Sequence, residues 1–157
     1  MTCTFAKKEK DMKQISCDSL NKIGLPMIQL EILGQVCWFI VDTGSNFNLI
    51  RADMMELYES NFPAIGLFSV SGIGGHSEEG IAYDIPYSLD GKQFSDQFSV
   101  VTERTFQPIE EMYGVKICGV VGTAFMLFHR FIIDLSEGTI HICVSPDDVR
   151  QHMRKTA

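Results

Sequence analysis

The stretch FIVDTGSNFNLI, residues 39–50, constrains the fold more than any other part of this sequence. It places one acid, Asp42, between two apolar runs and follows it with Thr-Gly-Ser. The run VCWFIV before the acid is apolar enough for a strand that is covered on both faces. Gly44 permits a close backbone approach that a Cβ atom would block. The sequence therefore predicts a sharp turn that presents a carboxylate at the end of a buried strand.

Short apolar runs bounded by Gly or Asp continue along the chain and predict a mostly β fold. PMIQLEIL and VCWFIV predict two strands joined by a tight turn at Gly34-Gln35. Asp90-Gly91 predicts a second hairpin turn, and residues 136–138 a third. Apolar residues near helical spacing predict a short helix over residues 48–60 and another over residues 123–131.

The length of 157 residues favours a single domain. The apolar pattern that begins at residue 25 continues to residue 144, and we assign this range to the domain. Residues 1–24 are polar and are predicted to form an arm or an extra edge element, with a turn of helix in DSLNKI. Residues 145–157 form a polar tail in which SPDDVRQHM has a serine cap and an early proline, so the tail is predicted to be helical.

Charge and composition exclude several classes of function. With 13 basic and 20 acidic side chains, the formal charge of −7 opposes binding to nucleic acid or to an anionic membrane. No apolar run has the length of a transmembrane helix, and the charged first residues do not look like a secretory leader, so we expect a cytoplasmic protein. Five cysteines without paired spacing are expected to be reduced thiols, with neither a metal nor a cofactor.

A three-letter match such as DTG is common and could mark a simple Asx turn. Three further features follow it in order: the glycine-tipped segment SGIGGHSEEGIAYDIPY, the motif CGVVG, and the segment GTAFMLFHRFIIDLSEGTIHI. Together with VDTGS they make residues 26–144 resemble the retropepsin-like aspartic proteases. In that family the segment like VDTGS carries the catalytic aspartate, and the glycine-tipped segment is a flap over the substrate. The motif like CGVVG packs beside the catalytic turn, and the last segment forms the helix and hairpin that close the domain.

The resemblance implies a closed β-barrel of the acid protease fold with one or two short helices, working as a homodimer on peptide or protein substrates. It assigns the catalytic turn to Asp42, Thr43 and Gly44, its support to Ser45, Val120, Val121 and Gly122, and the flap to Gly72, Ile73, Gly74 and Gly75. It further implies that Thr43 bonds across the dimer interface and that Ser45 bonds the catalytic carboxylate.

Aspartic protease chemistry needs two carboxylates that share a proton, one acting as general base on water and the other as general acid. This sequence offers one DTG turn, so the second acid is expected from Asp42 of a second copy. Two like charges so close cannot both ionise easily, which predicts an acidic to mildly acidic optimum. Asp134 also ends an apolar run but lacks the hydroxyl-glycine turn, while Asp84 and Asp90 are interpreted as solvated residues.

Two other interpretations remain open at this stage. The chain could keep the protease scaffold as a catalytically silent peptide-binding or dimerisation module, because a fold does not establish a function. A glycosidase that pairs Asp42 with Glu78 or Glu79 has less support, since the sequence shows no aromatic sugar platform. The glycines of the flap could likewise belong to a loop with no role in substrate binding.

Overall fold

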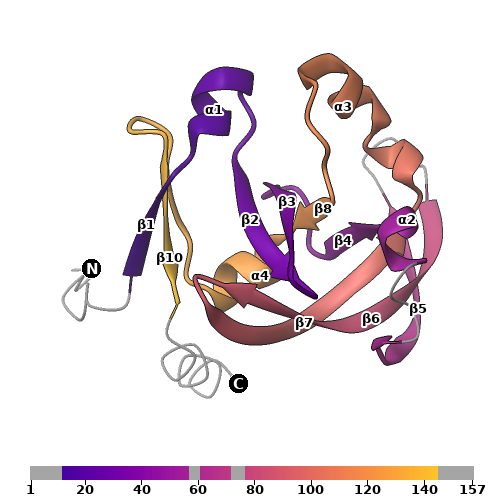
Figure 1. The fold of residues 1–157 in the computed structure, drawn as a ribbon. Coiled ribbons are helices and arrows are strands. Elements are labelled where there is room, and N and C mark those ends of the chain that lie inside the picture. Colours follow the sequence, from indigo (N-terminus) through magenta and orange to yellow (C-terminus); the bar gives the residue numbers. More distant parts are fainter. Residues whose placement is uncertain (1–11, 57–60, 72–76, 145–157) are drawn as a thin grey trace, which may run out of the picture.

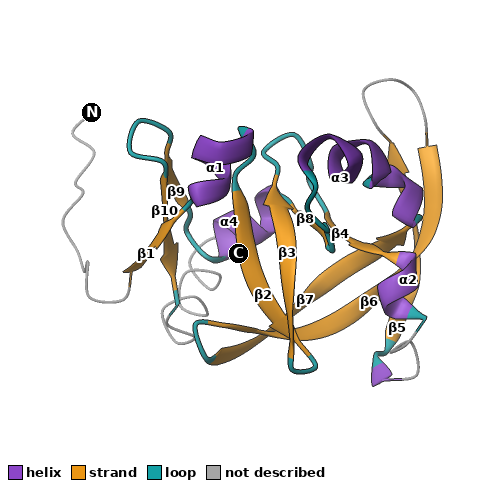
Figure 2. Ribbon diagram, turned by 45° about the horizontal axis from the view of Figure 1, so that its top comes forward, coloured by secondary structure: helices purple, strands orange, loops and turns teal. Residues whose placement is uncertain are grey.

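The computed structural model describes residues 12–56, 61–71 and 77–144. Strands dominate, and the helices are short and lie around them (Figures 1 and 2). In chain order the strands are β1 (Met12–Ser16), β2 (Met27–Ile32), β3 (Gln35–Val41), β4 (Asn48–Arg51), β5 (Ala64–Ser71), β6 (Ser77–Leu89), β7 (Lys92–Val101), β8 (Gly119–Val121), β9 (Ile132–Asp134) and β10 (Thr139–Cys143). The helices are α1 (Asp18–Ile23), α2 (Ala52–Met55), α3 (Gln107–Tyr113) and α4 (Thr123–Phe128), with a 3-10 turn η3 (Glu103–Thr105) before α3.

Six strands form a closed barrel. The order in the larger sheet is β2-β3-β8-β4-β7-β6-β5, and a further pairing of Glu31 with Ser88 joins β2 to β6 and closes the ring. β5 lies outside the ring, at the end of this order next to β6. The expectation of a mostly β chain with a closed barrel is therefore confirmed. One or two short helices were expected, and the described residues form four short α-helices.

A second, smaller sheet stands beside the barrel and has the order β1-β10-β9. β1 pairs antiparallel with β10 over its whole length, from Met12 opposite Cys143 to Ser16 opposite Thr139. Residues near the two ends of the described chain are thus held together, and α1 leads from this sheet into the barrel. The predicted helix in the tail lies outside the described residues.

Turn chemistry and burial explain the hairpins. Leu33 and Gly34 have positive φ angles of 49° and 78°, and Asp90 and Gly91 have φ angles of 54° and 73°. Two such residues in succession make the tight turn whose twist matches a β-hairpin. Along β2 the buried side chains include Ile28, Leu30 and Ile32, which join the main core.

Two local predictions differ from the structure. Residues 48–60 were predicted as a helix, but residues 48–51 form β4, and only Ala52–Met55 is helical in the described part of that range. All four residues of β4 are buried between β7 and β8, so tertiary pairing overrides the helical spacing. Helix α3 was not predicted, although it has Pro108 in its first turn and the left-handed Gly114 at its C-terminal end.

Candidate active site

The Asp42 turn, residues 42–47, connects β3 to β4. These two strands are not direct neighbours, because β8 lies between them, parallel to β3 and antiparallel to β4. Val41 is buried at the end of β3, whereas Asp42, Thr43 and Gly44 are exposed. The chain therefore brings a carboxylate from the core to the surface within one residue, as the sequence predicted.

Backbone hydrogen bonds hold this turn against the end of β8. Asp42 donates its N–H to the carbonyl of Val121 at 3.1 Å, and Thr123 donates its N–H to the carbonyl of Ser45 at 2.8 Å. A Cβ atom on Gly122 would lie 2.6 Å from the carbonyl oxygen of Phe47 and 2.7 Å from that of Ser45. Only glycine allows the two segments to approach so closely.

The carboxylate of Asp42 is oriented from within the turn. Its Oδ1 atom accepts the N–H of Gly44 at 2.8 Å, and a Cβ atom on Gly44 would lie 3.1 Å from the same oxygen. The Ser45 hydroxyl was expected to bond this carboxylate, but it donates to the carbonyl of Phe47 at 2.7 Å. That expectation is wrong for the single chain, because the Ser45 side chain closes the turn instead. Thr43 lies exposed beside Asp42.

The remaining predicted site residues fall into two groups. Val120, Val121 and Gly122 are all buried and place β8 and the start of α4 next to the turn. The flap residues Gly72, Ile73, Gly74 and Gly75 lie outside the described residues, as does His76. The strands that lead into and out of that segment, β5 and β6, are described and pair antiparallel.

The β5–β6 hairpin contacts the Asp42 turn through an aromatic pair. The rings of Phe47 and Phe68 are 6.1 Å apart in an edge-to-face arrangement. Phe47 is itself 45% exposed, so the turn has apolar surface. Elsewhere on the hairpin, Leu67 is 81% exposed and lies opposite the exposed Ile81.

Asn48 and Asp96 were not singled out in the sequence. Asn48 is 3% exposed, and its side chain forms hydrogen bonds with Asp96 and with the backbone of Gln97 and Gly122. Burial raises the pKa of Asp96, and hydrogen bonds from Gln97 and Asn48 partly offset this effect. The signal was a polar residue in the middle of the apolar run FNLI.

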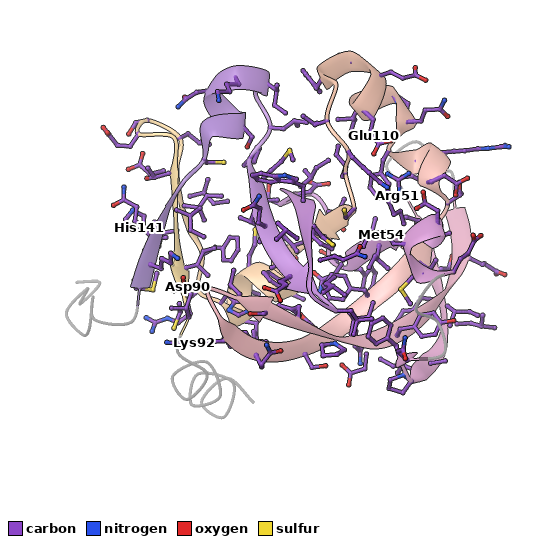
Figure 3. All side chains as sticks on the ribbon, in the orientation of Figure 1. Arg51, Met54, Asp90, Lys92, Glu110 and His141 are labelled. Carbon is purple, nitrogen blue, oxygen red and sulfur yellow. The ribbon has the colours of Figure 1, made fainter. Side chains whose placement is uncertain are left out.

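An ion-pair cluster joins β4, α2 and α3, and Figure 3 labels Arg51 and Glu110 near one another. Arg51 is buried, whereas Asp53 and Glu110 are partly exposed. Arg51 binds Asp53 with two hydrogen bonds of 2.6 and 2.9 Å and Glu110 with one of 2.6 Å. Burial disfavours the charge of Asp53, but the hydrogen bonds from Arg51 prevail and lower its pKa. Since Glu110 also accepts the N–H of Ile117, the cluster anchors α3 and the following loop.

His129 lies at the end of α4, fully enclosed by aromatic rings. Its Nε2 atom is 2.7 Å from the Tyr87 hydroxyl, and its Nδ1 atom is 3.0 Å from the carbonyl of Cys143. Burial lowers the pKa of His129 to about 4, and burial raises that of Tyr87. The neutral imidazole donates from Nδ1 and accepts from the Tyr87 hydroxyl, so both ring nitrogens are satisfied.

Other candidate groups have structural surroundings. Asp134 accepts hydrogen bonds from the backbone and hydroxyl of Ser136, which lower its pKa, and so closes the turn between β9 and β10. Asp90 forms an ion pair with Lys13. The thiols of Cys37 and Cys118 are buried and free. Contact with Cys118 raises the pKa of Cys37, and the reciprocal contact lowers that of Cys118 to about 7.

Within the described ranges, no group of three or more His, Cys, Asp or Glu side chains could hold a metal ion. No helix of that part of the chain is long and apolar enough to cross a membrane. No protein-family model matches the sequence, and no curated protein matches it.

Proposed function

We propose that this protein is a retropepsin-like aspartic endopeptidase that works as a homodimer. The observation that carries the proposal is the placement of Asp42, an exposed carboxylate on a short turn fixed by backbone hydrogen bonds at the junction of β3, β8 and β4. A catalytic acid needs this combination of exposure and fixed position, because misplacement by 1 Å is costly to the rate. The resemblance of VDTGS and CGVVG to the family motifs supports the same reading.

In the proposed reaction, two Asp42 carboxylates, one from each copy, lie about 3 Å apart and share one proton. The ionised carboxylate removes a proton from a water molecule, which attacks the carbonyl carbon of the peptide bond. The protonated carboxyl donates its proton to the carbonyl oxygen, which gives a tetrahedral gem-diol. The first carboxyl then passes the proton that it took from water to the amide nitrogen, the second takes a proton back from the gem-diol, and the C–N bond breaks to release the amine and the new carboxylic acid. The chemistry requires no covalent enzyme intermediate.

The second copy is part of the proposal because one chain supplies one such turn. The exposure of Asp42 and Thr43 in the single chain leaves both free to meet their counterparts across a two-fold axis. In this arrangement Thr43 bonds the partner turn, as the resemblance implies. Sharing one proton between two carboxylates raises one macroscopic pKa, and we expect maximal activity at acidic to mildly acidic pH.

The proposed substrate is an extended peptide that runs between the two Asp42 turns and the β5–β6 hairpins. The ring of Phe47 in the turn contacts the ring of Phe68 in the hairpin, and this apolar pair favours apolar side chains on the substrate. Residues 72–76, which follow β5 and precede β6 in the sequence, contain the predicted flap glycines and are proposed to close over the bound peptide.

The test is the isosteric Asp42→Asn substitution, which removes the acid and keeps the size of the side chain. We expect loss of peptide cleavage by about a thousandfold or more, with an unchanged circular dichroism spectrum and an unchanged sedimentation coefficient. Asp134→Asn is the matched control, because Asp134 also follows an apolar strand but closes a turn. Its cleavage rate should stay within about twofold of wild type.

Three results would contradict the proposal. The first is cleavage that survives unchanged in the Asp42→Asn protein, and the second is a wild-type protein that remains monomeric at every working concentration. The third is a crystal structure of the dimer with the two Asp42 carboxylates far apart. A dimer that binds extended peptides but cleaves none of a diverse library between pH 3 and 8 would favour the silent peptide-binding module.

A further inference from the structure

Asn48 has a side chain whose orientation is fixed by its neighbours. Its Nδ2 atom lies 3.1 Å from Oδ2 of Asp96 and 3.0 Å from the carbonyl oxygen of Gln97, and both of these groups are acceptors. Its Oδ1 atom lies 3.0 Å from the N–H of Gly122, which is a donor. Rotating the amide by 180° would break all three hydrogen bonds, so only one orientation fits.

This hydrogen-bonding arrangement connects three elements of the barrel. Asn48 is the first residue of β4, Asp96 belongs to β7, and Gly122 follows β8. Around the Gly122 bond, the carbonyl of Val121 accepts from Asp42 and the N–H of Thr123 donates to Ser45. Val121, Gly122 and Thr123 therefore all bind the turn or its end. For Gly122 the partner is a side chain, the amide oxygen of Asn48, and the Thr123 hydroxyl also donates to the Asn46 side chain at 3.5 Å.

We propose that Asn48 is a positioning residue for the Asp42 turn, and that Asp96 holds the Asn48 amide in the orientation that receives the Gly122 N–H. This inference rests on the proposed function, since positioning matters where Asp42 reacts. Asn48 is 3% exposed and touches no substrate in this scheme. It acts through Gly122, whose backbone lies too close to the turn to tolerate a Cβ atom.

The charge of Asp96 matters to this arrangement. An ionised carboxylate can only accept, so it forces the NH₂ group of Asn48 toward β7 and leaves the amide oxygen for Gly122. Burial and the charge of Asp84 on β6 raise the pKa of Asp96, whereas the N–H of Gln97 and the amide of Asn48 favour its ionised form. The charge of Asp96 in turn raises the pKa of Tyr87 on β6. A protonated Asp96 could donate instead, and the preference for one amide orientation would weaken.

The test begins with Asn48→Asp, which replaces the NH₂ donor by an oxygen of nearly the same size. The new carboxylate faces Asp96 and the Gln97 carbonyl, so the repulsion is expected to pull it from Gly122 at neutral pH. We expect kcat to fall about ten- to a hundredfold at pH 7 with a smaller change in KM. The deficit should shrink toward pH 5, where a proton shared with Asp96 restores a hydrogen bond between the two side chains.

The double variant Asn48→Asp, Asp96→Asn restores a donor and an acceptor in reversed places and returns the net charge to that of wild type. We expect it to recover at least about tenfold of the lost kcat, which a loss of general stability could not explain. Gln97→Glu adds the same charge on a neighbouring exposed side chain and is the electrostatic control. Ile140→Val removes one buried methyl group from β10 of the smaller sheet and is the control for reduced stability. Both control variants should keep wild-type kcat.

A readout independent of cleavage separates this inference from the proposed function. The amide signal of Gly122 in ¹H–¹⁵N spectra should shift in Asn48→Asp and return toward its wild-type position in the double variant. If wild type cleaves no peptide, the proposed function fails and the Gly122 signal alone decides whether Asn48 holds the turn. An unshifted Gly122 signal, or an unchanged kcat in both Asn48→Asp and Asp96→Asn, would overturn the inference.

Discussion

Asp42 and His129 are two polar residues that the same fold treats in opposite ways. Asp42 stands exposed on a turn, where the amide of Gly44 binds one of its carboxylate oxygens. His129 is enclosed among aromatic rings, and both of its ring nitrogens have partners inside the chain. The Asp42 carboxylate can still accept hydrogen bonds from a ligand or a second chain, whereas both ring nitrogens of His129 are already bonded within the fold.

At Asp42 the backbone is held in place by hydrogen bonds, whereas at His129 it is the side chain that holds other elements in place. At Asp42 the backbone is fixed by β8 and the side chain is left available, so little stability depends on the carboxylate itself. At His129 the side chain joins α4 to β6 and to the end of β10, so the packing of three elements depends on one ring. Function and stability should therefore separate cleanly between the two sites.

The largest expected effect on stability comes from His129→Ala. It leaves the Tyr87 hydroxyl and the Cys143 carbonyl unpaired in the core and opens a cavity, and we expect a loss of about 3–5 kcal/mol. Asp42→Ala should cost less than about 1 kcal/mol, because an exposed side chain loses one hydrogen bond. Urea denaturation of both variants measures their free energies of unfolding. Equal losses would contradict the claim that His129 supports the fold and Asp42 does not.

The pH dependence of stability should come next in size. The unfolded chain protonates His129 near pH 6.5, whereas burial lowers the pKa in the folded chain to about 4. Stability is therefore complete above pH 6.5 and declines as the pH falls toward 4, because the unfolded state binds the proton first. The difference corresponds to about 3 kcal/mol. Thermal unfolding across this range in wild type and His129→Gln should show a shallower slope for the variant.

Tyr87→Phe should have an intermediate effect. It removes the hydroxyl that donates to Nε2 of His129 and keeps the ring stacked on Phe94 and packed near Phe125. The unpaired buried nitrogen should cost about 1–3 kcal/mol. No change in stability would show that the hydroxyl bond contributes nothing.

The smallest expected effect is that of Ser45→Ala in the Asp42 turn. Its hydroxyl donates to the carbonyl of Phe47 near the surface, and we expect a loss of less than about 1 kcal/mol. Kinetics then refine the comparison. If the hydroxyl stays on Phe47 in the dimer, kcat should change by less than about threefold, whereas a bond to Asp42 in the working enzyme would produce a larger loss with a shifted pH profile.

Much of the barrel could be predicted from local sequence. The hairpin turn at Asp90-Gly91 follows from residues that tolerate positive φ angles, and the strands follow from short apolar runs between such turns. The first turn lies at Leu33-Gly34, one residue before the predicted Gly34-Gln35, because Leu33 also takes a positive φ angle and Gln35 begins β3. The sharp turn after Val41 could be predicted from an apolar run that ends at a single acid followed by Thr-Gly-Ser. These features depend on residues that are close together in the chain.

The features that could not be predicted depend on distant pairings. The insertion of β8 between β3 and β4 brings Gly122 against the turn, across some 75 residues of chain that no local pattern spans. The same insertion makes β4 a buried strand in spite of its helical spacing. Asn48 gains its importance from Asp96 and Gly122, and neither contact has a signature in the sequence.

The closure of the barrel by one residue pair, Glu31 with Ser88, has a consequence for how the molecule moves. Every other pair of neighbouring strands in the barrel has at least two paired residues, so we expect local opening to begin between β2 and β6. Opening of the β2–β6 pairing would let β5 and β6 move relative to β3, β8 and β4, which hold the Asp42 turn, while the other strand pairings of the barrel stay intact.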